Sequence, residues 1–372
     1  MDAIREKETL RRLLNERNAM RTKTFILALF AVVGAYSCRV AEETPFAEET
    51  IPFNSYGQVP CESPNVLFPD RIKRVVLDPG GSKDYIFSEI DKIVCHQDRF
   101  YILDWIHRKI VIYDSGGAPV GCLSRRGRGP GEYLQITDFD VDGDGSVWVV
   151  DGQQDMLLHY SPEGECVESR DFPFEVEFIK VLEDGRFLFS LAPWDSSKYG
   201  GKRLIVTDRE LNVEKSMLEY SEFIDPNYAF PSAGFQTADR TIYYHRPIDD
   251  CVYALTYSGD IVKKYVFDFG QRRVPDKARK DIGKYRSDFG GYTMLVKSVS
   301  VGDDFIIGSV LEGKEIKDFI IERAEGTANI LTEQISGMYM VGITGGYAIY
   351  RENHDNTENP DTAEEVLVLV SL

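Results

Sequence analysis

Two stretches of the chain decide its fold: residues 98–114, DRFYILDWIHRKIVIYD, and residues 144–160, DGSVWVVDGQQDMLLHY. In each stretch a turn leads into a hydrophobic strand that ends in Asp, at Asp104 and Asp151, and a short loop leads into a second strand. Runs rich in Val, Ile, Phe and Tyr that alternate with Gly-containing turns are typical of β-strands joined in hairpins. The two stretches therefore predict a repeating unit of short antiparallel strands.

Four looser copies of this unit follow in the sequence. They lie at 185–208, 240–256, 304–322 and 346–370. Each copy offers about four strands, and one sheet of that size cannot bury both of its faces, whereas sheets packed around an axis can. Six copies therefore predict an all-β fold, a six-bladed β-propeller. A β-sandwich, the alternative, does not explain six similar units.

The ends of the repeat region predict how the ring closes. The last copy stops at its third strand, residues 366–370, and a spare strand at 72–77 precedes the first copy. Pairing the two would supply a fourth strand and hide sheet edges that otherwise template aggregation. We therefore expect the propeller to span 65–372, with its last blade closed by the N-terminal strand. Only 273–288 has a helix-like composition, and we expect a loop insertion there.

Composition excludes two classes of protein. The chain has 372 residues, of which 43% are hydrophobic and 12% aromatic, so it can bury a core and is not disordered as a whole. It carries 61 Asp and Glu against 43 Lys and Arg, a formal net charge of −18. A protein that reads the phosphate backbone needs a basic face, so we expect no nucleic-acid partner.

The N-terminal segment has the layout of a secretory signal. Residues 25–36, FILALFAVVGAY, form an uncharged apolar run that follows Arg21 and Lys23 and is too short to span a membrane. The Cys38 just beyond this run resembles the lipidated cysteine of a bacterial lipobox, which predicts a signal segment over 1–37 and a lipid on Cys38. An ordinary signal peptide and a stop-transfer anchor are the alternatives.

Three further features bear on this segment. Tyr36 departs from the lipobox pattern, where a smaller residue is usual, and the polar residues 1–19 raise the hypothesis that translation starts at Met20. Pro, Glu and Thr dominate residues 42–64, which predicts a flexible tether over 38–64. We therefore expect an exported protein, periplasmic or surface-exposed, that touches the outer membrane only through its N-terminal lipid.

Residues 124–133, SRRGRGPGEY, carry a family resemblance. They resemble the R-G-x-G-P-G-E-[YF] motif of six-bladed β-propeller lipoproteins common in Bacteroidetes, which are similar to NHL-repeat proteins. The spacing from Asp104 through Arg108 to Ile110 resembles the NHL signature. The resemblance implies a binding or scaffold protein. It also invites comparison with NHL-like lyases, which use metal-binding histidines around the channel.

The loop 124–133 is the first candidate binding site. Arginine side chains grip carboxylate, sulfate or phosphate in a fork, and glycines let the backbone approach a partner closely. The loop therefore predicts contact with an anion or an acidic glycan at the channel mouth. The residues concerned are Arg125, Arg126, Arg128, Glu132 and Tyr133. The alternative is an inter-blade connection whose arginines pair with acidic residues of the protein itself.

A second candidate group follows the strands of the first two copies. It consists of Asp104, Trp105, His107, Arg108 and Asp151. Carboxylates at the ends of equivalent strands would either line the axial channel or accept hydrogen bonds from backbone N–H groups of the next turn. An exposed Trp suits stacking on a sugar ring, whereas a buried one would cap a blade.

Asp140, Asp142 and Asp144 match the spacing of a calcium-binding loop. A strand follows directly at 147–150, however, and this order is typical of a hairpin turn at 142–145. We favour the turn and keep calcium as the weaker alternative. We predict no other cofactor.

No catalytic pattern stands out in the sequence. Its five histidines show no His-x-His or His-x-x-x-His spacing, and no G-x-S-x-G occurs. We therefore predict no catalytic residue. The preferred function is a binding or scaffold module for a glycan, a peptide or an outer-membrane partner protein. The alternative is an NHL-like lyase or hydrolase that uses the axial channel, with or without a metal.

Overall fold

The structure is a computed structural model, and its strands belong to one unit, Ala47–Leu372. The residues that it describes are 46–222, 224–227, 234–352 and 365–372. The predicted signal segment 1–37 and the lipidation site Cys38 lie outside them. In the described ranges, no helix is both long and apolar enough to cross a membrane.

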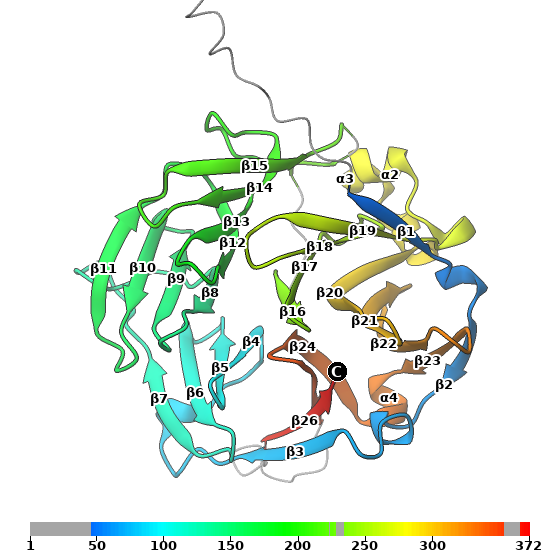
Figure 1. Cartoon of the computed structure of the whole chain (residues 1–372), viewed down its shortest axis with the longest axis horizontal. Helices are drawn as coiled ribbons and strands as arrows, with labels where there is room; N and C mark the ends of the chain where they lie inside the picture. Colours follow the sequence, from blue (N-terminus) through cyan, green and yellow to red (C-terminus); the bar gives the residue numbers. More distant parts are fainter. Residues whose placement is uncertain (1–45, 223, 228–233, 353–364) are drawn as a thin grey trace, which may run out of the picture. The chain divides into compact units, whose positions relative to one another are not determined.

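The strands form six separate sheets, which we number as blades in chain order. Figure 1 shows them side by side in a ring. Blade 1 contains β4 (Lys92–His96), β5 (Arg99–Asp104), β6 (Lys109–Asp114) and β7 (Pro119–Leu123). Blade 2 contains β8 (Asp138–Val141), β9 (Val147–Asp151), β10 (Met156–Tyr160) and β11 (Cys166–Asp171). Blade 3 contains β12 (Val176–Val181), β13 (Phe187–Leu191), β14 (Lys202–Thr207) and β15 (Val213–Glu219).

The last three blades each receive a strand from the N-terminal part of the chain. Blade 4 contains β16 (Gln236–Ala238), β17 (Thr241–His245), β18 (Cys251–Leu255), β19 (Ile261–Phe267) and β1 (Ala47–Ile51). Blade 5 contains β20 (Thr293–Val301), β21 (Phe305–Glu312), β22 (Glu315–Glu322), β23 (Thr327–Leu331) and β2 (Gly57–Pro60). Blade 6 contains β24 (Met338–Thr344), β25 (Tyr347–Glu352), β26 (Glu365–Ser371) and β3 (Ile72–Leu77).

Strand β9 shows why the sheets pack around an axis. Its Val147 and Val149 belong to a hydrophobic cluster shared with blade 1, whereas its Trp148 and Val150 belong to one shared with blade 3. Alternate residues of a strand point to opposite faces of the sheet. Both faces of the blade are therefore apolar and need a neighbouring sheet. The six-bladed β-propeller predicted from the repeat is confirmed.

The ring closes through β3, as the sequence predicts. Strand β3 runs antiparallel to β26, with Leu77 opposite Glu365 and Ile72 opposite Val370. Val75 and Leu77 are buried in a cluster that also contains residues of blade 1. The strand of blade 6 that comes first in the sequence therefore pairs with the one that comes last, and it buries one of its faces.

The predicted tether is wrong for part of its length, because residues 47–60 are folded onto the propeller. Strand β1 adds to the outer edge of blade 4 in parallel to β19, and β2 adds to the outer edge of blade 5 in parallel to β23. We call residues 47–77 the N-terminal belt, because they pass along blades 4, 5 and 6 in turn (Figure 1, blue).

The physical reason for this correction lies in the contacts of the belt. The Glu48 carboxylate pairs with Lys264 at 2.8 Å, and Glu49 pairs with Lys263 at 2.6 Å. Phe53 is 4% exposed and packs edge-on against Phe319, with ring centroids 5.1 Å apart. The acidic side chains that suggest a solvated tether in the sequence are therefore ion-paired, and Phe53 is buried.

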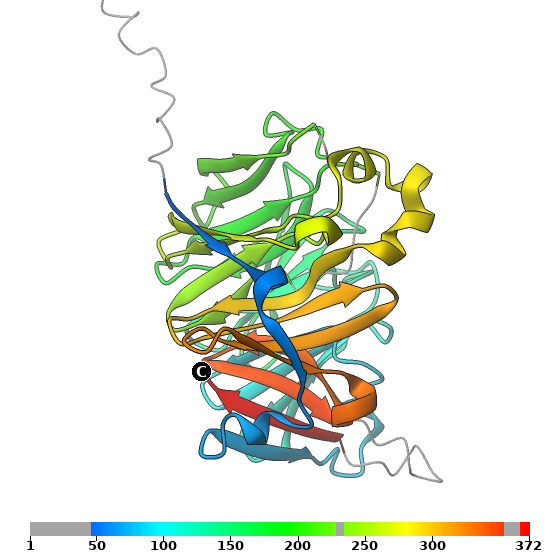
Figure 2. The ribbon, with the colours of Figure 1, turned by 90° about the vertical axis from the view of Figure 1, so that its right-hand side faces the viewer.

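An insertion between β19 and β20 carries two short helices, α2 (Asp276–Lys280) and α3 (Ile282–Tyr285). Its Val274, Ala278 and Ile282 are buried together, so the segment expected to be a loop has a small core of its own. Figure 2 shows the insertion (yellow) on the opposite side of the ring from the C-terminus. The other short helices are η2 (Phe53–Ser55), η3 (Pro64–Val66), η4 (Lys83–Tyr85), η5 (Gly270–Arg272), η6 (Arg286–Gly291) and α4 (Glu333–Ser336).

Candidate functional site

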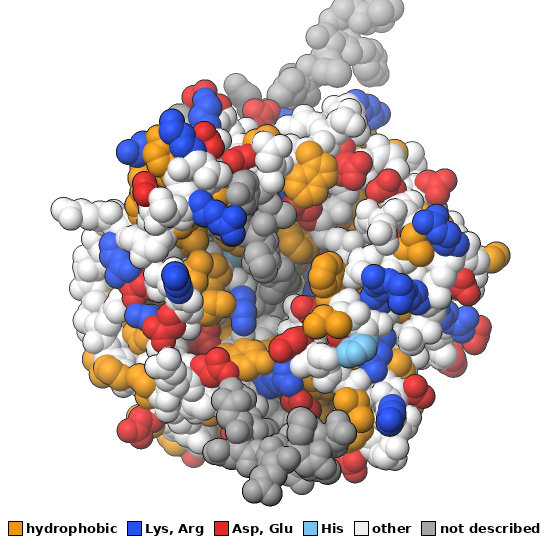
Figure 3. All heavy atoms as spheres, turned by 180° about the vertical axis from the view of Figure 1, so that it is seen from behind, with side chains coloured by type: hydrophobic (Ala, Val, Ile, Leu, Met, Phe, Trp, Pro, Cys, Tyr) orange, Lys and Arg blue, Asp and Glu red, His pale blue; other side chains and the backbone are white. Residues whose placement is uncertain are grey.

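The two faces of the ring differ in what they carry. The innermost strands, β4, β8, β12, β16, β20 and β24, all begin on one face, which we call the upper face, and end on the other, the lower face. Because the strands of a blade alternate in direction, the connections between blades and the loops between second and third strands lie on the upper face. Both predicted groups of site residues therefore share the upper face, which is the view in Figure 3.

The 124–133 loop is fastened to blade 1 by Tyr133. This side chain is fully buried, and its hydroxyl lies 2.9 Å from the carbonyl oxygen of Arg108 and 3.1 Å from that of Leu123. The hydroxyl also accepts a hydrogen bond from the Arg125 N–H at 3.1 Å. Tyr133 therefore serves the fold, and it is not presented to a ligand.

The acidic and glycine residues of the motif also shape the loop. The Gly129 N–H donates to the Glu132 carboxylate at 2.7 Å, so this carboxylate is used inside the loop. Gly131 has a φ of +71°, and a Cβ built there would lie 2.5 Å from the Cβ of Cys166 in β11. Only glycine fits that close approach between the loop and blade 2.

The three arginines of the loop have different surroundings. Arg125 pairs with Glu165 at 3.0 Å, which matches the inter-blade alternative. Arg126 and Arg128 are exposed, and within the described ranges neither guanidinium has an ion-pair or hydrogen-bond partner. Figure 3 shows basic and acidic side chains interspersed over this face. Arg126 and Arg128 are therefore the part of the motif that is open to a partner.

Asp104 and Asp151 close the blades through backbone hydrogen bonds. Asp104 is fully buried and accepts from the Ser88 N–H at 2.9 Å and from the His107 N–H at 3.1 Å. Asp151 is also fully buried and accepts from the Leu134 N–H at 2.7 Å. Each carboxylate thus holds the segment that leads into the innermost strand of its own blade.

Blade 3 uses the same device at a position that the sequence comparison missed. Asp195 accepts from the Glu175 N–H at 3.2 Å, just before β12, and from the Ser197 N–H at 3.1 Å. Asp195 lies beyond the end of β13 and not at its last residue, so the alignment of strand ends does not reveal it. The recurrence in three blades supports the structural interpretation of Asp104 and Asp151.

The remaining residues of this group flank Asp104. Trp105 is 52% exposed, so it does not cap a blade, and its backbone N–H donates to Asp91 at 2.7 Å. The His107 ring lies 2.7 Å from Asp104, and Arg108 adopts a φ of +56° at the turn into β6. Trp105 is the member of the group that is available on the surface.

Asp142 and Asp144 lie in the hairpin turn between β8 and β9. The Gly145 N–H donates to the Asp142 carbonyl at 2.9 Å, and the Ser146 N–H donates to the Asp144 carboxylate at 2.9 Å. Asp140 points instead into the axial channel, where it binds Lys180. Among the described residues, no group of His, Cys, Asp or Glu side chains converges in a way that would hold a metal ion.

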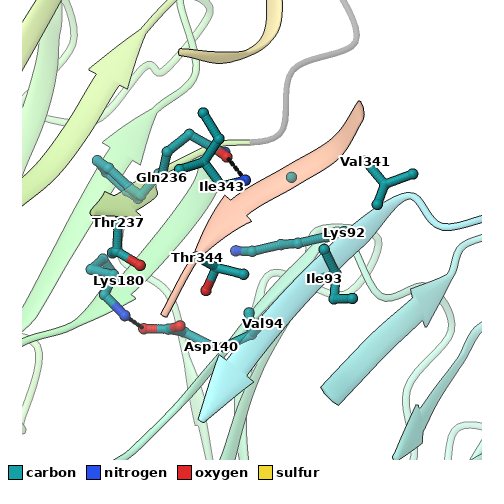
Figure 4. A pocket seen from close by; sticks show the side chains of 12 residues that line it. Lys92, Ile93, Val94, Asp140, Lys180, Gln236, Thr237, Val341, Ile343 and Thr344 are labelled. Atoms are coloured by element: carbon teal, nitrogen blue, oxygen red, sulfur yellow. Dashed lines mark hydrogen bonds and ion pairs between the residues drawn. The ribbon is translucent and has the colours of Figure 1, made fainter. Parts of the chain in front are cut away.

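Polar side chains in the axial channel join the innermost strands. Lys180 donates to Asp140 at 2.6 Å (Figure 4). Lys92 donates to Asp138 at 2.7 Å. Gln236 of blade 4 accepts from the Ile343 N–H of blade 6 at 3.0 Å, across the ring. A free volume of about 10 Å³ remains here, which is about enough for one water molecule.

The channel widens at its lower mouth into a pocket of about 380 Å³. We call this the lower-mouth pocket. Its walls come from the ends of the innermost strands in blades 1, 2, 3, 4 and 6, from the turns that follow them and from the β18–β19 turn of blade 4, which contributes Tyr257. The lining residues are Val94, Cys95, His96, Val141, Asp142, Gly143, Lys180, Val181, Leu182, Glu183, Thr237, Tyr257, Thr344 and Gly345.

Lys180 is the charged group at the floor of this pocket. Burial by itself lowers the pKa of Lys180, but the negative charge and the hydrogen bond of Asp140 outweigh it, so the net shift is upward. Lys180 is therefore an ammonium ion that is held by one carboxylate and lies 5.9 Å from the centre of the Tyr257 ring. Burial raises the pKa of the Cys95 thiol to about 12, so this wall residue is not a thiolate nucleophile.

The sequence did not reveal this pocket. Its residues come from five blades as single residues or short runs of two to four, and no run carries a diagnostic motif. Only Asp142 belonged to a predicted group, as a member of the calcium alternative. The one local signal is that all of them except Tyr257 lie at or just after the end of the first strand of a repeat, which becomes readable once the copies are aligned.

Comparisons with known proteins agree with this architecture. The chain resembles the crystal structure of a protein described as exported, from Bacteroides fragilis, with a TM-score of 0.70 and 17% identity over 87% of this chain and 99% of that one. It also resembles a member of the duf4221 family from Bacteroides vulgatus, with a TM-score of 0.52 and 10% identity over 81% of this chain and 96% of that one. The search of curated proteins found no match.

Fold and site together define a β-propeller of six blades whose innermost strands are joined by polar side chains, with a pocket of about 380 Å³ at one mouth. Residues 81–360 match the family model described as "Domain of unknown function (DUF4934)". Because this match covers most of the chain, the chain belongs to that family.

Proposed function

We propose that this protein is an exported, lipid-anchored binding module that takes its ligand in the lower-mouth pocket. The ligand is a glycan or the end of a peptide or partner protein. The observation that carries the proposal is the pocket itself, whose volume of about 380 Å³ lies within the range of about 300–1,000 Å³ that is typical of ligand sites. Ion pairs and a hydrogen bond between the innermost strands lie behind the pocket, so we expect a ligand to bind at the mouth.

The proposed export and lipid anchor rest on separate observations. The apolar run at 25–36 followed by Cys38 has the layout of a lipoprotein signal, and a propeller of similar fold is described as exported. We expect the mature protein to begin at a lipidated Cys38. Mass spectrometry of the mature N-terminal peptide checks this, and an unmodified N-terminus at another residue would contradict it.

A ligand screen tests the site. Purified protein is screened by thermal shift against oligosaccharides and short peptides, and calorimetry then measures the dissociation constant of each hit. Tyr257→Ala alters the pocket, whereas Arg126→Ala/Arg128→Ala alters the exposed arginines of the opposite face and is the matched control. We expect Tyr257→Ala to weaken binding about tenfold or more, equivalent to about 1.4 kcal/mol, and the arginine variant to leave it unchanged.

Two results would contradict this proposal. Loss of binding only in the arginine variant would place the site in the 124–133 loop, as the sequence motif suggests. Binding that neither variant alters would show that the ligand site lies elsewhere on the propeller. We expect both variants to remain folded, because Tyr257, Arg126 and Arg128 are not core residues.

A further inference from the structure

We infer that the lower-mouth pocket binds a neutral sugar, that is, a short saccharide with several hydroxyls and no formal charge. The inference rests on the proposed function, because it names the ligand class of the same pocket. Three properties of the pocket lead to it: paired charges, unused hydroxyls and an apolar wall.

The charges at the pocket are already paired. Lys180 holds Asp140 at 2.6 Å, and Glu183 holds Arg240 at 2.7 Å. Asp142 lies 3.9 Å from Arg209 and also accepts from the Gly143 N–H at 2.6 Å. A charged ligand group would have to compete with one of these partners or remain unpaired after losing its water, and both are unfavourable. An uncharged ligand meets neither cost.

Hydrogen-bonding groups in the pocket are only partly used. Within the described part of the chain, the hydroxyls of Thr237 and Tyr257 have no hydrogen-bond partner. The Thr344 hydroxyl accepts from the Cys95 N–H at 3.2 Å, which leaves its own hydrogen to donate. Lys180 has three N–H donors and uses one of them on Asp140.

These groups lie near one another. Figure 4 shows Thr237, Thr344 and Lys180 around the same part of the channel. A hydroxyl can donate and accept at once, so a ligand with several hydroxyls can match free hydroxyls and ammonium donors together. A purely accepting ligand, such as a carboxylate, would use the donors but leave the hydroxyl lone pairs unmatched.

The walls between these groups are apolar. Val94, Val141 and Leu182 contribute aliphatic surface, and Tyr257 contributes an aromatic ring close to Lys180. A sugar ring presents C–H groups on its faces and hydroxyls at its rim, which matches an aromatic or aliphatic wall beside polar side chains. The free volume sets the size at a short saccharide or the end of a longer one.

Calorimetry with a charge-matched ligand panel tests the inference. The panel consists of neutral oligosaccharides, uronic-acid oligosaccharides of the same length, amino-sugar oligosaccharides and short peptides. The variants are Tyr257→Phe and Thr237→Val, which each remove one pocket hydroxyl with little change of shape. Thr241→Val, on the neighbouring strand β17 and outside the pocket, is the control, and melting curves establish that all three variants are folded.

We expect a neutral member of the panel to bind, and each pocket variant to weaken that binding about threefold to tenfold, as loss of one hydrogen bond does. The Thr241→Val control should bind like the wild-type protein. Binding of the acidic, amino-sugar or peptide members alone, with the same dependence on Tyr257 and Thr237, would overturn the sugar inference and leave the proposed site standing.

Neutral-sugar binding that is insensitive to both pocket variants would overturn the inference and the proposed site together. Absence of neutral-sugar binding, when the earlier screen has given a ligand that depends on Tyr257, would overturn the inference alone. Absence of binding by every member of both panels would count against both.

Discussion

Val75 of β3 lies opposite Leu367 of β26 in the antiparallel pair that closes blade 6. Both side chains are buried in the cluster between blades 6 and 1. The ring is therefore held shut by packing between two segments from opposite ends of the sequence, and not only by the hydrogen bonds of one strand pair.

A charge at Val75 should weaken the packing of β3 that closes blade 6. Val75 is 3% exposed, whereas its neighbour Val76 is 44% exposed on the same strand. We expect Val75→Asp to lower the free energy of unfolding by about 3 kcal/mol or more, because it buries an unpaired carboxylate. Val76→Asp should change it by less than about 0.5 kcal/mol. Urea unfolding measures both, and equal effects would mean that β3 is not sealed on its inner face.

The N-terminal belt should contribute directly to stability. Phe53 is buried against Phe267, Phe269 and Phe319, so we expect Phe53→Ala to cost about 3–5 kcal/mol through the cavity it leaves. Val59→Ala, at a residue that is 47% exposed on the same belt, is the control and should cost little. Thermal or urea unfolding measures both variants. If Phe53→Ala lowered the free energy of unfolding no more than the control, the belt would not contribute to stability through Phe53.

Asp104 should make the free energy of unfolding depend on pH in the acidic range. Burial acts to raise the pKa of Asp104, but hydrogen bonds from Ser88 and His107 outweigh it and lower the pKa below 3.8. A lowered folded-state pKa gives stability that is present above the unfolded value and is lost as the pH falls through the folded value. We therefore expect the stability difference between wild type and Asp104→Asn to shrink as the pH falls from about 5 to below 3.8. A difference that does not vary with pH would show that the charge of Asp104 contributes nothing.

The channel ion pair should be costly to break and cheaper to replace. Asp140→Leu leaves the Lys180 ammonium without its counter-charge, and Lys180→Met does the same to the Asp140 carboxylate; we expect each to lower the free energy of unfolding by about 3–5 kcal/mol. Asp140→Leu/Lys180→Met removes both charges and should cost clearly less than the sum of the two single changes. Urea unfolding of the four proteins gives the coupling free energy, and additive effects would mean that the two groups do not interact.

Gly131 should tolerate alanine less well than another glycine with a positive φ. Both Gly131 and Gly164 lie in the left-handed region, at +71° and +82°, so alanine is strained at either site by about 1–2 kcal/mol. At Gly131 the new Cβ would also meet Cys166, whereas at Gly164 nothing lies within 4 Å. We expect Gly131→Ala to lower the melting temperature more than Gly164→Ala, and an equal loss would mean that the loop shifts without cost.

The fold was largely readable from the sequence because its signal is local and repeated. Each blade carries its own strands and turns, and the spare strand 72–77 is apolar on the side that faces the core. The belt was not readable, because composition alone suggests solvation for residues such as Glu48 and Glu49. Their partners, Lys263 and Lys264, are remote in sequence, so only the fold brings these charges together.

The candidate site was less readable for a related reason. The 124–133 motif is a continuous stretch, and the structure shows that Tyr133, Glu132 and Gly131 serve the loop itself. The lower-mouth pocket, by contrast, is assembled from short pieces of five different blades. A pattern search finds neighbours along the chain, whereas this pocket consists of neighbours around an axis.

The belt also determines how mechanical load would enter the protein. A pull on the chain ahead of Ala47 reaches β1 first, then the buried Phe53, and then β2, before it reaches the closing strand β3. Each of these attachments must detach before the force reaches the pairing of β3 with β26. A pulling force on the N-terminus would therefore act first on the outer strands of blades 4 and 5, while blade 6 remains closed.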